Sequence, residues 1–192
     1  MKPLALLALV ALAGPALADG PPKDADWPCV QRKVPHLSLG SVWAGPLPDD
    51  ALEARSQDGA IRETAARLAL RRTGEDEARA LIAATAPGDR AALYLAVFRD
   101  IDHTRDRVMQ GIARYARKQT ELDTRINALR VEQRGLEGSK DFDRIDTVER
   151  DLDWATRIFR ERQQSLTYVC EVPVILEQRA FALGREVMAQ LQ

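Results

Sequence analysis

The chain has 192 residues, enough for one domain with a substantial core, and its 28 basic and 29 acidic residues leave a net charge of −1. A charge so close to neutral argues against nucleic acid or an anionic lipid surface as the partner. Charged residues make up 30% of the chain and aromatic residues 5%, which favours exposed amphipathic helices over a compact β-rich fold.

Residues 1–18 have the pattern of a signal peptide. Lys2 precedes an unbroken apolar run over residues 4–12, and Ala-Leu-Ala at 16–18 supplies the small residues that signal peptidase recognises. The alternative is an N-terminal membrane anchor, but the run is short for a bilayer span. No second run of sufficient length follows. We therefore expect a periplasmic protein with no stable membrane anchor after cleavage.

The two cysteines, Cys29 and Cys170, are 141 residues apart. In an oxidising compartment a lone pair of cysteines is most simply an intramolecular disulfide. Closing a loop of this length stabilises a fold by about 5 kcal/mol in the chain-entropy treatment. The alternatives are a metal-binding thiol pair and an intermolecular bridge.

Residues 19–48 are predicted to form an extended, proline-rich arm. Six prolines interrupt any regular helix here: Pro21, Pro22, Pro28, Pro35, Pro46 and Pro48. The segment also carries Trp27, Trp43 and several aliphatic residues, so we expect it to lie over the helices, pinned by Cys29. The alternative role of Trp27 and Trp43 is to bind a ligand or partner.

Helices are expected from residue 49 to the C-terminus, and the first three are short. The first follows Asp49, which can cap it, and ends near Arg55. The second is predicted over residues 60–72. The third is predicted over residues 75–86, with Thr73 as its capping residue and Pro87-Gly88 as the break after it.

The strongest pattern lies in residues 89–192. Two series of apolar or small residues, over 93–129 and 145–187, recur at steps of three and four. Such steps keep one stripe on one helix face, and the second series is a heptad repeat. A turn near 135–140 separates the two series, so we expect an antiparallel, coiled-coil-like hairpin.

The register of this hairpin follows from the turn. It predicts three contacts between the helices: Leu129 with Ile145, Leu122 with Leu152, and Tyr115 with Phe159. Pro173 lies inside the second helix and should kink it or split it in two. The expected fold is all-α: residues 49–86 and 174–192 form a small base, and the hairpin over 104–135 projects about 47 Å from it.

One cluster of residues has the composition of a metal site. Asp100, His103 and Asp106 recur at steps of three, which places two carboxylates and an imidazole on one helix face. His36 is the other histidine and a further possible ligand. The alternative is a solvated polar face with local salt bridges, because di-metal helical bundles need two such elements and only one is present.

The sequence carries no enzyme signature. We find no G-x-S-x-G, H-E-x-x-H, Walker or Rossmann motif, and no C-x-x-C. We therefore predict no cofactor and a non-enzymatic binding or adaptor protein that presents the hairpin to a protein partner or self-associates, with Trp154 as a possible contact. The alternatives are a periplasmic metal- or cofactor-handling protein using the Asp100, His103 and Asp106 face, and a hydrolase with no recognisable nucleophile.

Overall fold

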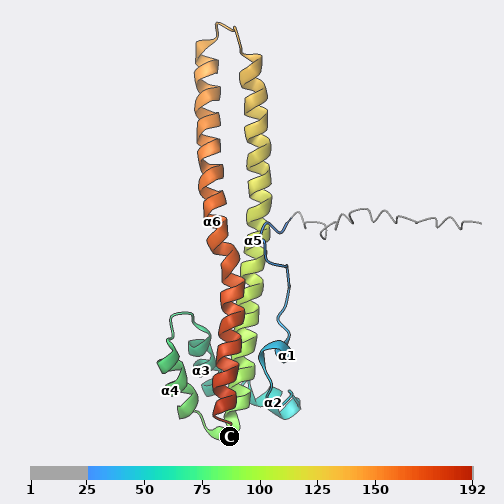
Figure 1. Ribbon diagram of the computed structural model, residues 1–192, viewed down its shortest axis with the longest axis vertical. Coiled ribbons are helices and arrows are strands. Elements are labelled where there is room, and N and C mark those ends of the chain that lie inside the picture. The colour runs from blue at the N-terminus through green and yellow to red at the C-terminus, as the bar shows by residue number, and fades with distance from the viewer. Residues whose placement is uncertain (1–25, 192) are drawn as a thin grey trace, which may run out of the picture.

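The computed structural model describes residues 26–191 (Figure 1). The predicted signal peptide lies outside the described residues. The described part is helical and contains no strand, as predicted. Its helical segments are α1 (Leu39–Val42), α2 (Asp50–Arg55), α3 (Gly59–Ala69), α4 (Glu75–Ala84), a single 3₁₀ turn η1 (Pro87–Asp89), α5 (Arg90–Gly135) and α6 (Phe142–Ala189). Figure 1 shows the short helices gathered at one end of the long α5–α6 hairpin.

The core of the base surrounds the first two turns of α5, where residues 91–97 are all buried. A helix that is apolar on every side must be packed against other elements on every side to be buried from water. Here α1, α3, α4 and the C-terminal part of α6 pack around α5. Tyr94 stacks on Trp43 with ring centroids 4.4 Å apart. Its hydroxyl lies 3.1 Å from the carbonyl oxygen of Val42 and 3.0 Å from that of Ala180. Burial raises the pKa of Tyr94, so this hydroxyl keeps its proton and ties α1, α5 and α6 together.

Two arginines hold the ends of helices in the base. The guanidinium of Arg179 on α6 donates to the carbonyls of Leu68, at 2.9 Å, and Thr73, at 3.1 Å, where α3 ends. Arg90 donates to the carbonyls of Thr85, just after α4, and Gln190, just after α6. Carbonyls at a helix C-terminus lack intrahelical donors, so these contacts fix the short helices against the hairpin.

Beyond the base, the hairpin has only its own two helices. A second, smaller cluster of buried residues holds them together there: Ile126, Leu129, Val148 and Ala155. Leu122 and Leu152 pack against this distal cluster, as the predicted register requires. Ile145 instead lines a hollow beside the turn, with Leu136 and Val148.

A polar layer separates the two clusters. The Tyr115 hydroxyl donates to the carbonyl of Arg162 at 2.6 Å, and the Gln119 amide donates to the carbonyl of Phe159 at 2.8 Å. Tyr115 thus reaches the α6 backbone near the predicted partner Phe159, with a hydrogen bond where the register predicted an apolar contact. These side-chain bonds to the facing backbone hold the register here together with the buried apolar residues Ile112 and Ala116.

Thr73 does not cap α4, contrary to the prediction. The helix begins at Glu75 after an N-cap at Gly74 that makes no side-chain hydrogen bond. The Thr73 hydroxyl turns back and donates to the carbonyl of Arg67 at 2.6 Å. It therefore closes α3, which ends at Ala69, three residues earlier than predicted.

Pro173 does not split the second helix, because α6 runs unbroken from Phe142 to Ala189. A proline removes one intrahelical hydrogen bond and crowds the preceding turn. Pro173 is buried one turn from Cys170 and Leu176, which are also buried. Packing on both sides of the proline maintains the helix despite the missing bond.

The arm departs from the predicted extended form in one place, the single turn of α1 (Leu39–Val42). Val42 and Trp43 are buried in the base core, and Leu37 just before α1 is also buried. The arm is therefore partly a structural element of the base, and residues 26–36 run along α5 outside it (Figure 1).

No single helix among residues 26–191 is long and apolar enough to cross a membrane. The segments Glu75–Ala84 and Pro87–Gly135 together are long and apolar enough for a span, but they are bent by 112° where they meet.

Candidate functional site

The disulfide between Cys29 and Cys170 is present, with the two Cα atoms 5.6 Å apart. It joins the arm to the middle of α6, and polar contacts also hold the arm to α5. The Leu37 amide donates to an Asp102 carboxylate oxygen at 2.8 Å, and Asp26 pairs with Arg117 at 2.8 Å. A disulfide of this kind is consistent with an oxidising compartment outside the cytoplasm.

Arg105 is the buried charge of the hairpin. Its side chain is 3% exposed, and the guanidinium donates to the carbonyls of Val34, at 2.6 Å, and Pro35, at 3.3 Å. Its Nε has no hydrogen-bond partner within the described residues. Burying a guanidinium is unfavourable unless acceptors compensate, so the arm backbone and this side chain depend on each other.

Replacing Arg105 with Met keeps the aliphatic part and removes the donors to the arm. We expect the free energy of unfolding to fall by about 2 kcal/mol, the usual value for hydrogen bonds to a charged group. Amide exchange should also accelerate at residues 34–37. Arg107→Met is the matched control, because Arg107 is exposed and its side chain hydrogen-bonds only to Thr104 among residues 26–191, so its effect should stay within about 0.5 kcal/mol. Equal stability of the two variants would contradict the role given to Arg105.

The residues of the predicted metal face do not converge on one point. Asp100 pairs with Arg62 of α3 at 3.1 Å, Asp106 accepts from its neighbour Gln110 at 2.8 Å, and His103 is exposed. His36 lies 3.4 Å from Asp102 and not with the three. Among residues 26–191 no group of three or more metal-ligating side chains is placed to hold an ion. The geometry therefore gives the metal hypothesis no support.

The three tryptophans have different surroundings. Trp43 is 7% exposed in the base core, and its indole N–H donates to the carbonyl of Pro46 at 2.9 Å, so it acts in packing. Trp27 is half-buried, and its indole N–H donates to the carbonyl of Gln31 within the arm. Trp154 is 63% exposed on α6. Of the three, Trp154 alone is mostly exposed to solvent.

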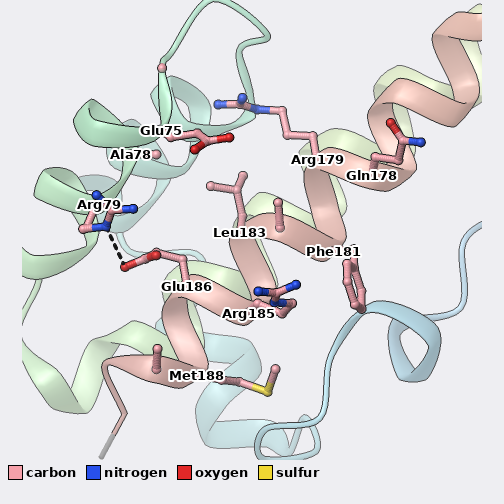
Figure 2. A pocket seen from close by; sticks show the side chains of 13 residues that line it. Glu75, Ala78, Arg79, Gln178, Arg179, Phe181, Leu183, Arg185, Glu186 and Met188 are labelled. Carbon is pink, nitrogen blue, oxygen red and sulfur yellow. Dashed lines mark ion pairs between the residues drawn. The ribbon is translucent and has the colours of Figure 1, made fainter.

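An open groove of about 740 Å³ lies between α4 and the C-terminal part of α6 (Figure 2). Most of its charged residues already have partners: Arg79 pairs with Glu186 at 3.5 Å, Arg179 binds the end of α3, and Arg185 lies over the Phe181 ring. The groove offers no nucleophile with an adjacent base. We interpret the groove as part of the packing interface between the short helices and the hairpin.

The distal hairpin, residues 119–159, is the part of the α5–α6 hairpin that lies farthest from the base (Figure 1). No short helix covers it (Figure 1). Its exposed large apolar residues are Val131, Phe142 and Trp154. Leu122, Leu136, Leu152 and Phe159 are only half-buried, although they pack on the distal cluster. Exposed apolar surface on a projecting element is typical of a site that binds another protein.

Searches of protein-family models, curated proteins and solved structures found no match to this chain. The candidate site is therefore defined by geometry alone.

Sequence reasoning did not find Arg105, Tyr94 or Gly184. Gly184 of α6 lies close to α1, where a Cβ would be 2.5 Å from the carbonyl oxygen of Val42. Tyr94 could have been suspected, because it lies within the apolar run at 91–97 and a buried phenol needs a hydrogen-bond acceptor. Gly184 could have been suspected as a glycine inside a helix, where it usually marks a close approach. Arg105 has no such signal, because nothing local shows that an arm 70 residues away crosses it.

Proposed function

We propose that this is a non-enzymatic periplasmic binding or adaptor protein whose distal hairpin contacts a protein partner. The observation that carries the proposal is the extent of the hairpin that projects beyond the base with apolar side chains exposed. The signal-peptide pattern of residues 1–18 and the disulfide support an exported protein.

The two ends of the molecule also contribute unequally to the buried core. The base contains most of the buried apolar residues. Hydrogen bonds from Tyr94, Arg90 and Arg179 to backbone carbonyls hold its helices together. The distal hairpin contributes only four fully buried residues to the fold. A long projection with so little share in stability fits a recognition element better than a structural one.

Trp154→Ala tests the proposal, because this ring contributes little to the fold. We expect the free energy of unfolding to change by less than about 0.5 kcal/mol. Partner capture from a periplasmic extract, after cross-linking and mass spectrometry, should fall at least tenfold, as for a tryptophan at the centre of an interface. Phe181→Ala, an exposed aromatic residue of α6 in the base, is the matched control and should capture normally. If Trp154→Ala captures the same proteins at the same level, the distal hairpin is not the binding surface.

A further inference from the structure

Charge is unevenly distributed along the projecting hairpin. Residues 121–153, which include the turn, carry ten acidic and six basic side chains, a net charge of −4. The adjoining stretches 105–120 of α5 and 154–169 of α6 carry eight basic and two acidic side chains, a net charge of +6. We call these the acidic half and the basic half. They have nearly equal lengths, 33 and 32 residues.

Several of these charges are available to a partner. The following side chains are exposed and have no ion pair among the described residues: Asp146, Glu149 and Asp153 in the acidic half, and Arg114, Lys118 and Arg160 in the basic half. Other charges in these halves do pair within the chain, as in Arg125 with Asp151 at 3.2 Å. The uncompensated excess therefore has opposite sign in the two halves.

In the acidic half the apolar seam is only partly covered. Its two helices bury only a short row of side chains, and Leu122 and Leu152 remain half-buried. Two more helices packed on this seam would cover it, as in a four-helix bundle. A suitable occupant therefore has a helical hairpin of the same length and the opposite order of charge.

We propose that this occupant is a second copy of the chain, packed antiparallel so that the acidic half of each copy lies against the basic half of the other. This rests on the proposed function, since both use the distal hairpin, and it names the partner. A single chain supplies both halves, so the contact is self-complementary and closes as a two-fold dimer. A parallel arrangement would place net −4 on net −4 and is disfavoured by like-charge repulsion.

The symmetry places Trp154 at the centre of the dimer. In an antiparallel overlap of equal halves, the two-fold axis crosses α6 at the boundary between residues 153 and 154. Trp154 then lies beside Trp154 of the other copy, where the pair would be shielded from water. This gives the exposed tryptophan a role that the monomer does not.

Complementary charge reversal tests the proposal with the full oxidised chain. One variant carries Asp146→Lys, Glu149→Lys and Asp153→Lys, and the other carries Arg114→Glu, Lys118→Glu and Arg160→Glu. By sedimentation equilibrium the wild type should be a dimer that weakens at least tenfold from 50 to 500 mM salt, because salt screens exposed charges. Each variant alone should be at least tenfold weaker than the wild type, and an equimolar mixture of the two should recover a heterodimer. A monomeric wild type at 100 µM and 50 mM salt, or a mixture no tighter than its components, would overturn the proposal.

A distance measurement tests the orientation. With Cys29 and Cys170 kept oxidised, a spin label on Ser139→Cys at the turn should report a separation between the two copies of about 48 Å, from 32 residues of overlap at 1.5 Å each. A label on Thr156→Cys should report a much shorter separation, because it lies near the axis. Turn labels within 25 Å of each other would show a tip-to-tip arrangement and overturn the antiparallel proposal.

These results are distinguishable from failure of the proposed function. A monomer whose partner capture still depends on Trp154 would leave the adaptor proposal standing and reject the self-association. A dimer with the predicted charge behaviour whose capture of other proteins is unchanged by Trp154→Ala would support the self-association and reject the adaptor proposal.

Discussion

Replacing Cys29 and Cys170 together with serine should lower the free energy of unfolding by about 5 kcal/mol. The bond closes a loop of 141 residues, and in the chain-entropy treatment a loop of that length restricts the unfolded chain by this amount. The loss is comparable with the whole net stability of many domains. It should be measured by urea denaturation of the oxidised protein and of the double variant, monitored by circular dichroism.

Two controls separate this effect from damage to the native fold. The urea m-value should rise in the double variant, because an unlinked unfolded chain exposes more surface. Wild-type protein treated with a phosphine reductant should match the double variant, which excludes a specific effect of serine. If the double variant loses less than 1 kcal/mol, the unfolded chain retains contacts between the arm and α6, and the entropic argument fails for this protein.

The sequence predicted the features of the fold that arise from regular repetition. The heptad series over 145–187 and the turn at 135–140 specified the hairpin, because an apolar stripe on each of two joined helices leaves few other ways to bury both. The same register placed Leu122 and Leu152 at one level of the hairpin, and both pack against the distal cluster. Compartment and redox reasoning identified the disulfide, because two cysteines allow only one intramolecular pairing.

The errors lie where tertiary contacts override local preference. Thr73 is a residue type that can cap α4, yet its hydroxyl donates to the carbonyl of Arg67 at the end of α3. The carbonyl of Thr73 in turn accepts a hydrogen bond from Arg179. Pro173 was expected to kink or split the helix, and the split does not occur, because buried residues flank the proline and α6 continues through it. Arg179 binds the Thr73 carbonyl from 106 residues away, a contact about which a pattern of a few residues carries no information.

The candidate site was harder to predict than the fold. Asp100, His103 and Asp106 have suitable chemistry and spacing, but Arg62 on a separate helix pairs with Asp100. Trp43 and Trp154 were equal candidates by residue type. The structure buries the first against Tyr94 and exposes the second, because only the base has helices on several sides.

Replacing Gly184 with alanine should destabilise the protein by about 3 kcal/mol. A Cβ at this position of α6 would lie 2.5 Å from the carbonyl oxygen of Val42 and 2.9 Å from the hydroxyl of Tyr94. The first atom belongs to the backbone, so the base must open to accept the methyl group. Overpacking of a core costs about 1–3 kcal/mol, and displacing the buried Tyr94 hydroxyl from its carbonyl acceptors adds about 1 kcal/mol or more.

Gly111→Ala is the matched control for this prediction, because it makes the same chemical change inside the other long helix. Its Cβ would meet nothing nearer than an Arg114 nitrogen at 3.8 Å, so the higher helix propensity of alanine should stabilise α5 by up to about 1 kcal/mol. The two substitutions should therefore shift the urea midpoint in opposite directions. The double variant Gly184→Ala with Tyr94→Phe should lose less than the sum of its single effects, because removing the hydroxyl makes room for the methyl group. A stabilised Gly184→Ala would mean that α1 does not approach α6 as closely as the Val42–Gly184 contact requires, and that the arm is not a structural part of the base.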